Sequence, residues 1–317
     1  MRHFPTKVSV IIPSAGHPAM LAEALRSVRA LEGSDLELTP IVIDDGNDVR
    51  TEAVAAGYGA RYIRATSHGP AGARNAGLRA ASGDFIAFLD DDDRWLPGHL
   101  RPHIRVMRER PEVGAVFGQV VSYDSSFEHH TAAWPDPFPA GRTGFARVFG
   151  YQPQIGATVV RSSVVDSVGY FDEALLGDED WDWQLRLALI HAVEFIGVPS
   201  VAYRCRPDGQ TAADEINWKR LPYFDTVFWR NALRAGRARP PWAVILRGYL
   251  RIRGQVAAGF LSSAQVHSMA GDRRAARRQL VRGFLASPIH SLLWFWRKAS
   301  ARRTFLHAMA FSGGRDV

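Results

Sequence analysis

Short apolar runs rich in β-branched residues alternate with helical patterns in the first part of this chain. Four such runs are expected to form strands: Lys7–Pro13, Pro40–Asp44, Ala60–Ile63 and Phe85–Leu89. Apolar residues recur at helical spacing over residues 21–31, and a second helical pattern covers residues 71–81. Strands separated by helices predict an α/β fold with a mostly parallel central sheet covered on both faces. In such sheets, ligands bind outside the carboxyl ends of the strands.

Acidic residues stand at two of these strand ends. The second strand runs into Asp44-Asp45-Gly46 and the fourth into Asp90-Asp91-Asp92-Asp93. Because alternate side chains of an extended segment share a face, Asp90 and Asp92 are expected to point together, toward one Mg²⁺ or Mn²⁺ ion. The alternative is a solvated acidic turn in which Asp93 helps to start a helix after Pro97. The four acids by themselves leave both interpretations open.

A glycine-rich segment, Gly69–Gly77, lies between the two acidic strand ends. Glycines allow close backbone approach, and the amides at a helix start attract anions. Arg74 within this segment could add a bidentate contact to a phosphate or a base. The alternative is a purely structural turn, and its position beside the acids favours a binding role.

A further acidic segment, Asp178–Trp183, precedes a leucine-rich stretch and is expected to open an amphipathic helix. One interpretation is helix capping and dipole compensation, worth roughly 0.5–1 kcal/mol per acid. The other is a carboxylate that the helix N-terminus keeps ionised and that serves as a general base.

The balance of charge divides the chain. Residues 1–212 hold 20 Lys and Arg against 27 Asp and Glu, whereas residues 213–317 hold 19 against 5. We therefore expect two domains, 1–212 and 213–317, with a boundary near Arg206-Pro207-Asp208-Gly209, where Pro and Gly interrupt the pattern.

The cellular compartment is suggested by three features. Cys205 is the only cysteine, so no internal disulfide can form and a reducing cytoplasm fits. No long apolar run follows Met1–Lys7, so we expect no signal peptide. No stretch reaches the length that a membrane-spanning helix needs. These features predict a cytoplasmic protein that is soluble or lies on the inner membrane surface.

The second domain is expected to be helical, with helices over Trp242–Met269 and Arg273–Ala286. The apolar stripe of Leu280, Phe284 and Leu285 is expected to be core. The last stretch, Leu292–Lys298, mixes aromatic and cationic side chains as interfacial helices do, which leaves contact with an anionic membrane and simple docking on the first domain as alternatives. No nucleic-acid-binding motif accompanies these residues, so we expect no nucleic-acid partner.

Six motifs in this order resemble the inverting family-2 glycosyltransferases of the GT-A fold. They are VSVIIPSAG at 8–16, VIDDG at 42–46, GARNAGLRAA at 72–81, GDFIAFLDDDDRW at 83–95, GYFDE at 169–173 and EDWDW at 179–183. The resemblance covers about residues 7–204, which makes 1–212 the catalytic domain. It implies a nucleotide-sugar donor, a divalent cation, and transfer of a sugar to an acceptor hydroxyl with inversion.

The resemblance also assigns roles to residues of this chain. Asp90 and Asp92 match the two acids of the DxD motif, with Asp92 as the direct Mn²⁺ or Mg²⁺ ligand, and Asp180 matches the catalytic base. The residues assigned to the nucleotide are Pro13, Ser14, Asp45, Arg74 and Asp91. The acceptor, whether a glycan, a lipid-linked sugar or a small molecule, is left open.

The chain departs from the family at three places. Ala15-Gly16 replaces an aromatic or asparagine pair, and no histidine follows the final strand at Tyr203–Pro207. The QxxRW motif of processive members is absent, so one sugar per encounter is expected. The alternatives are a non-catalytic nucleotide-sugar-binding protein and a membrane-surface assembly protein with the same fold. A sugar-nucleotide pyrophosphorylase is disfavoured because Pro13–Pro18 lacks its glycine- and arginine-rich phosphate loop.

Overall fold

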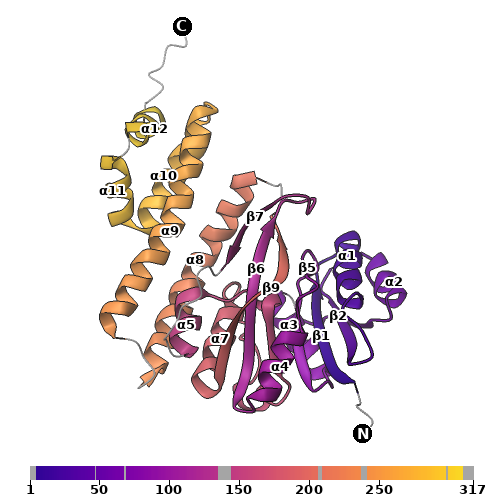
Figure 1. Cartoon of the computed structure of the whole chain (residues 1–317). Coiled ribbons are helices and arrows are strands. Elements are labelled where there is room, and N and C mark those ends of the chain that lie inside the picture. Colours follow the sequence, from indigo (N-terminus) through magenta and orange to yellow (C-terminus); the bar gives the residue numbers. More distant parts are fainter. Residues whose placement is uncertain are drawn as a thin grey trace. The chain divides into compact units, whose positions relative to one another are not determined.

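The computed structural model describes residues 5–46, 48–67, 69–134, 144–205, 209–236, 241–297 and 299–309. The chain forms two compact units (Figure 1): unit 1 comprises Met1–Pro207 with Thr226–Arg239, and unit 2 comprises Asp208–Asp225 with Pro240–Val317. Residues 206–208 of the expected boundary lie outside the described part. Helix α8 (Gly209–Arg234) contributes residues to both units. The division at residue 212 stays a prediction.

Unit 1 is built on a nine-stranded sheet with the order β3-β2-β1-β4-β8-β6-β9-β5 and with β7 beside β6. The strands are β1 (Thr6–Ser14), β2 (Leu36–Asp44), β3 (Arg61–Arg64), β4 (Phe85–Phe88), β5 (Arg94–Trp95), β6 (Val113–Tyr123), β7 (His130–Trp134), β8 (Thr158–Arg161) and β9 (Ala192–Arg204). The four strands from β3 to β4 are mutually parallel, as are β6 and β9, whereas β8 and β5 run antiparallel to their neighbours. The predicted α/β class with a mostly parallel sheet is confirmed.

Helices connect these strands. In unit 1 they are α1 (Pro18–Arg29), α2 (Arg50–Gly57), α3 (Pro70–Ala80), α4 (Arg101–Glu109), α5 (Gly144–Tyr151), a 3₁₀ turn η1 (Ile155–Ala157), α6 (Val164–Val168) and α7 (Glu179–Ile190). The two helices expected from apolar spacing correspond to α1 and α3 within a few residues.

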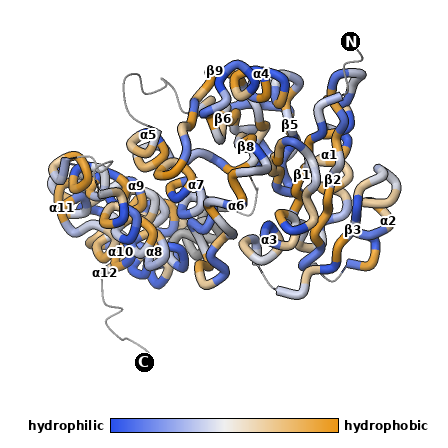
Figure 2. The backbone as a smooth tube through the Cα atoms, turned by 90° about the horizontal axis from the view of Figure 1, so that it is seen from below, coloured by the Kyte–Doolittle hydropathy of each residue, from blue (hydrophilic) through white to orange (hydrophobic). Residues whose placement is uncertain are grey.

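Strand β1 is buried on both faces, as its unbroken apolar run requires. Val10 and Ile12 belong to the cluster that includes Leu21 and Leu25 of α1. Ile11 points to the opposite face, where a Cβ on Gly77 of α3 would lie 2.4 Å from the Ile11 Cγ2 atom. Gly77 therefore lets α3 approach the sheet closely, and Figure 2 shows β1 and β2 running between α1 and α3.

Unit 2 contains α9 (Trp242–Met269), α10 (Arg273–Ala286), α11 (Pro288–Arg297) and α12 (Ala299–Met309). The two helices expected in this region match α9 and α10 residue for residue, and Asp272 caps α10 by accepting a hydrogen bond from the Ala275 N–H at 2.9 Å. Within the described residues, no helix carries an apolar stretch long enough to cross a membrane. Lys298 of the expected interfacial stretch lies outside that part.

The expectation that the apolar stripe of α10 is core was wrong for two of its three members. Phe284 and Leu285 are 48% and 54% exposed. The residues that α10 buries are Ala276, Gln279, Arg282, Gly283 and Ala286, and of these Gly283 and Ala286 pack against α9. A Cβ on Gly283 would lie 2.9 Å from the Leu261 Cδ2 atom of α9, so small size is what permits this close helix contact.

Two histidines are buried in the core of unit 1. His99, just before α4, and His103, in its first turn, are fully buried, with ring centroids 4.6 Å apart. The His99 ring also lies 4.7 Å from the Trp95 ring. Burial lowers the pKa of His99 well below its ordinary value and that of His103 to about 3. Both imidazoles are therefore neutral in the folded protein near pH 7.

This pair predicts an acid-sensitive fold. Below the ordinary histidine pKa of 6.5, the two imidazoles bind protons in the unfolded chain but stay neutral in the folded one. The free energy of unfolding should therefore fall as the pH drops toward 3. The slope should be about 1.4 kcal/mol per pH unit for each histidine. In urea titrations between pH 7 and 5, His99→Phe/His103→Leu should have a flatter profile, and His130→Leu, at an exposed site, should keep the original slope. Equal slopes in all three proteins would contradict this assignment.

Candidate active site

The carboxyl ends of the parallel strands bring the predicted site residues together in unit 1. Ser14 at the end of β1 is in register with Asp44 at the end of β2, and the Asp45 N–H donates to the Ser14 carbonyl at 2.9 Å. On the other side of β1, the Leu89 N–H donates to the Ile11 carbonyl at 3.0 Å, which brings the acids after β4 to the same edge. One sheet edge thus carries both acidic motifs.

The four acids after β4 alternate between two environments. Asp90 and Asp92 are partly exposed, whereas Asp91 and Asp93 are buried. Asp91 accepts hydrogen bonds from the Ser14 Oγ at 2.7 Å and the Ala15 N–H at 3.3 Å. Burial raises the pKa of Asp91 to about 6, against the hydrogen bond from Ser14. Asp91 therefore fixes the end of β1 through its hydrogen bonds with Ser14 and Ala15.

Asp93 is held by the end of β9. Its carboxylate accepts from the Arg204 N–H at 2.9 Å and from the Gln154 Nε2 at 3.1 Å. The Arg204 Nε donates to the Asp92 carbonyl at 2.8 Å, and its guanidinium lies 4.2 Å from the centre of the Phe127 ring. Arg204 thus fixes the acidic loop from the end of β9. Nothing in the sequence near Arg204 indicates this role, because its partners Asp92 and Asp93 lie far away in the chain.

The two acids at the end of β2, Asp44 and Asp45, differ in their exposure to solvent. Asp44 is fully buried and accepts hydrogen bonds from the Tyr62 hydroxyl and the Arg64 guanidinium. Asp45 is partly exposed, and its Oδ2 accepts from the Gly69 N–H at 2.6 Å. Asp45 therefore anchors the residue that caps α3, while part of its surface stays accessible.

The same loop depends on Gly46. A Cβ at this position would lie 2.4 Å from the Gly16 backbone N and 2.6 Å from the Ala15 carbonyl carbon. The two strand-end loops are thus in backbone contact, which a larger residue would prevent.

Arg74 of α3 is the centre of the site. Its Nη1 donates to Glu179 Oε1 at 2.8 Å and its Nη2 donates to Asp90 Oδ1 at 2.9 Å. Its side chain is only 5% exposed. Burial lowers the pKa of Arg74, but the charges of Asp90, Glu179 and Asp180 raise it more, so the net shift is upward. The guanidinium therefore stays charged and joins the acids after β4 to the start of α7.

The next residue, Asn75, makes a second connection between motifs. Its Nδ2 donates to the Phe171 carbonyl at 3.0 Å and to Glu173 at 2.8 Å, and its Oδ1 accepts from the Phe171 N–H at 2.8 Å. The Phe171 ring in turn stacks on Trp183 of α7, with centroids 5.0 Å apart. The glycine-rich helix and the loop at 169–173 thus form one body with α7.

Three acids occupy the first turn of α7, and the structure distinguishes them. Glu179 is buried against Arg74. Asp182 is 1% exposed and pairs with Arg186 at 2.9 Å and Arg230 at 2.8 Å. Asp180 is partly exposed and accepts from the Trp181 N–H at 2.7 Å. Of the three, Asp180 is the acid without an ion pair in the described part of the chain.

The charges of these segments act on one another. Burial and the charges of Asp92 and Asp180 raise the pKa of Asp90, against the opposing effect of Arg74. The Asp180 carboxylate thus lies close enough to the acids after β4 to influence their protonation.

A divalent cation fits the exposed pair, Asp90 and Asp92. Both present hard oxygen donors, and their mutual repulsion favours a bound cation. Among the described residues, no three His, Cys, Asp or Glu side chains converge to form a complete metal site. A cation held by this pair would take its remaining ligands from a bound phosphate or water, as is usual for Mg²⁺.

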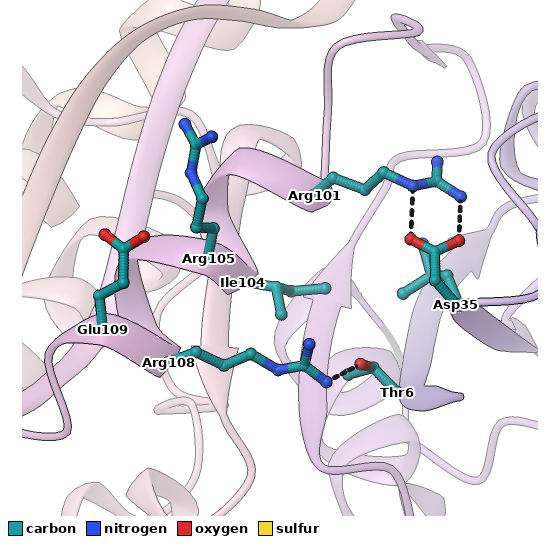
Figure 3. Close-up of a pocket in the computed structure, with 8 residues that line it drawn as sticks. Thr6, Asp35, Arg101, Ile104, Arg105, Arg108 and Glu109 are labelled. Carbon is teal, nitrogen blue, oxygen red and sulfur yellow. Dashed lines mark hydrogen bonds and ion pairs between the residues drawn. The ribbon is translucent and has the colours of Figure 1, made fainter. Parts of the chain in front are cut away.

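A separate hollow of about 430 Å³ lies at the opposite end of the strands (Figure 3). Thr6 at the start of β1 and Asp35 just before β2 line it. The Nε and Nη2 of Arg101 in α4 each donate a hydrogen bond to one carboxylate oxygen of Asp35, both at 2.8 Å. Because it lies at the amino ends of the strands, we assign it no part in the site.

Comparison with known proteins agrees with this arrangement. The sequence model of the glycosyl transferase family 2 matches residues 9–160. An uncharacterised glycosyltransferase of Bacillus subtilis, YwdF, is 27% identical over 237 residues, which cover 72% of this chain and 85% of that protein. A Campylobacter jejuni protein named GalNAc(5)-diNAcBac-PP-undecaprenol β-1,3-glucosyltransferase is 37% identical over 101 residues, 30% of this chain and 32% of that one.

Solved structures show the same fold. TarS 1–349 of S. aureus in complex with UDP-GlcNAc superposes with a TM-score of 0.58 at 15% identity, covering 95% of this chain and 90% of that one. The mannosyltransferase PcManGT of Pyrobaculum calidifontis, in complex with GDP-Man and Mn²⁺, superposes with a TM-score of 0.59 at 18% identity, covering 96% and 85%. Residues 9–160 therefore carry a glycosyl transferase family 2 domain, and the chain has the GT-A fold of these solved structures.

Proposed function

We propose that this protein transfers a hexose from a nucleotide-diphosphate donor to an acceptor hydroxyl, with inversion, with the help of a divalent cation, and one sugar at a time. One observation supports this most directly: the buried Arg74 holds Asp90, beside the partly exposed Asp92, next to the start of α7. There Asp180, unlike Glu179 and Asp182, makes no ion pair with a residue that the structure describes. A pair of cation ligands and a candidate base thus share one sheet edge.

The donor pocket is proposed along the ends of β1 and β2. Asp45 would accept a hydrogen bond from the base, and Pro13 and Ser14 would form the wall beside it. Asp91 would act by holding Ser14 and Ala15 in place. For Arg74, the contacts favour a supporting role, because both of its Nη atoms are already used by carboxylates.

Asp90 and Asp92 would hold Mn²⁺ or Mg²⁺. When bound, such a cation neutralises charge on the departing diphosphate. The related mannosyltransferase PcManGT was solved in complex with GDP-Man and Mn²⁺, which is consistent with this choice of cation.

Asp180 is proposed as the general base. The amino end of α7 favours an ionised carboxylate at this position, and Asp180 is accessible while its neighbours in the turn are engaged. It would take the proton of the acceptor hydroxyl as that oxygen attacks the anomeric carbon and the nucleoside diphosphate departs. A single displacement of this kind inverts the anomeric configuration and needs no covalent sugar–enzyme intermediate.

The acceptor is proposed to be a glycan, a lipid-linked sugar or a small molecule of cell-surface polysaccharide synthesis. The names of two relatives mention an undecaprenol diphosphate and succinoglycan biosynthesis. We further propose that the basic unit 2 contacts an anionic membrane from the cytoplasmic side.

Removing the proposed metal ligand tests the cation. In calorimetry, Mn²⁺ should tighten nucleoside diphosphate binding to the unchanged protein, and Asp92→Ala should lose at least about tenfold of that affinity. Asp166→Ala removes an exposed acid of α6 and should behave like the parent protein. If the diphosphate binds equally with and without Mn²⁺, the proposed metal dependence is incorrect.

Neutralising the proposed base tests the chemistry. Asp180→Asn keeps the acceptor oxygen for the Trp181 N–H but removes the basicity, so turnover should fall roughly 10²–10⁴-fold. Donor affinity should change little, and the product should have the configuration opposite to that of the donor. Asp166→Asn is the matched control. Unchanged turnover in Asp180→Asn would exclude it as the base, retention would refute the mechanism, and donor binding without turnover in the parent protein would favour the non-catalytic alternative.

Arg74→Met tests the supporting role. It leaves Asp90 and Glu179 without their shared cation, so the free energy of unfolding should fall by about 3–5 kcal/mol. Arg110→Met breaks exposed pairs with Glu112 and Glu194, which solvent screens, so its effect on the free energy of unfolding should be much smaller. Urea unfolding followed by tryptophan fluorescence measures the free energy of unfolding of both variants. Similar decreases in the two variants would contradict a supporting role for Arg74. Adding Glu179→Gln should recover part of the loss.

A further inference from the structure

The outward face of α10 in unit 2 is apolar over the second half of the helix. Gly283 and Ala286 pack against α9, whereas Val281, Phe284 and Leu285 are about half exposed. Large apolar side chains on the open side of a helix are unfavourable in water unless something covers them.

These side chains line an apolar hollow of about 440 Å³. Its walls come from α9 to α12, and the residues that form them are Leu261, Arg277, Leu280, Val281, Phe284, Leu285, Ser291, Leu292, Trp294, Phe295 and Phe305. The neighbouring surface of α11 and α12 is apolar as well, with Trp296 74% and Leu306 68% exposed. The tube of α11 accordingly shows orange stretches in Figure 2. A hollow with such walls suits a hydrocarbon chain.

A second hollow of about 440 Å³ adjoins the first. The two share Arg277, Val281 and Leu285, so they meet along α10. The second is lined with four arginines of α10, which are Arg274, Arg277, Arg278 and Arg282. The Arg282 guanidinium carbon lies 5.4 Å from the centre of the Trp218 ring, and both residues line this hollow.

Helices α9 to α12 carry few acids. Residues 241–309 contain eleven arginines and one lysine but a single acid, Asp272, whose carboxylate caps α10. Within the described residues, Arg274 and Arg277 make no ion pair. An anion is therefore the complementary occupant of the second hollow.

We propose that the adjoining hollows bind one anionic phospholipid of the membrane surface, with an acyl chain in the apolar hollow and the phosphate against Arg274 and Arg277. An apolar site joined to a cationic one matches a molecule that carries a chain and a phosphate together. The inference deepens the proposed membrane contact, because it replaces a diffuse attraction between a basic surface and anionic lipid by a defined site on α10.

The experiment uses the full chain and a soluble lipid. Dihexanoyl-phosphatidylglycerol, below its micelle concentration, should bind with one site per chain in calorimetry, and inorganic phosphate should bind at least about tenfold more weakly. Dihexanoyl-phosphatidylcholine, which carries no net charge, should also bind more weakly. The fraction of protein that sediments with phosphatidylglycerol vesicles should fall in the same variants that lose affinity for the soluble lipid.

Matched variants locate the site. Leu285→Asp in the hollow and Leu246→Asp on α9 place the same charge at positions 54% and 51% exposed. The first should weaken lipid binding at least tenfold, and the second by less than twofold. Arg277→Gln should weaken binding, whereas Arg247→Gln, on α9 outside both hollows, should not.

Three outcomes would overturn the inference: equal effects of the paired variants, phosphate binding as tight as lipid binding, or a concentration-dependent dimer that Leu285→Asp abolishes without any lipid binding. Nucleoside diphosphate binding and turnover with a soluble acceptor, measured on the same proteins, report on unit 1. A parent protein that binds lipid but shows neither nucleoside diphosphate binding nor turnover would refute the proposed transferase alone. A parent protein that shows turnover but binds no lipid would refute the lipid site alone.

Discussion

The charged side chain of Arg74, buried between two carboxylates, is the contact on which the rest of the site depends. Asp90 follows a strand and Glu179 begins a helix more than eighty residues further along the chain, yet both reach the same guanidinium. Either acid alone would be costly to bury, and so would the arginine. The helix that carries Arg74 is in turn seated on the sheet through Gly77, which lets it approach Ile11 closely.

The same principle organises the surrounding loops. Asp91 and Asp93 turn inward to donors from Ser14 and Arg204, which leaves Asp90 and Asp92 on the accessible side. A run of four acids can thus exist at one sheet edge because Asp91, Asp93 and Asp90 have partners within the fold, the last of them Arg74. Asp90 and Asp92 stay partly exposed, which is the basis for the cation that we propose at this edge.

The two units differ in the chemistry of their surfaces. Unit 1 gathers carboxylates at one edge of its sheet. In unit 2, Val281, Phe284 and Leu285 of α10 are about half exposed, and two of them line a hollow together with arginines. The acidic first part and the basic second part of the sequence thus correspond to different surfaces, for which we propose a cation with a nucleotide in unit 1 and an anionic amphiphile in unit 2.

The sequence by itself determined the first four strands of the sheet, its mostly parallel character and the bounds of α9 and α10, because apolar periodicity and Gly, Pro and Asp signals are local. It also identified the acidic motifs and the alternation of Asp90 with Asp91. It did not indicate β5 to β9. It could not identify Arg204 as the support of the acidic loop, because the partners of Arg204 lie far away in the chain. It singled out Asp180 only through the resemblance to the family, whereas the ion pairs that engage Glu179 and Asp182 became visible only in the structure. It also favoured the wrong face of α10. A helix with large apolar residues on one side and small ones on the other can be buried through either, and only the close contact of Gly283 with Leu261 decided between them.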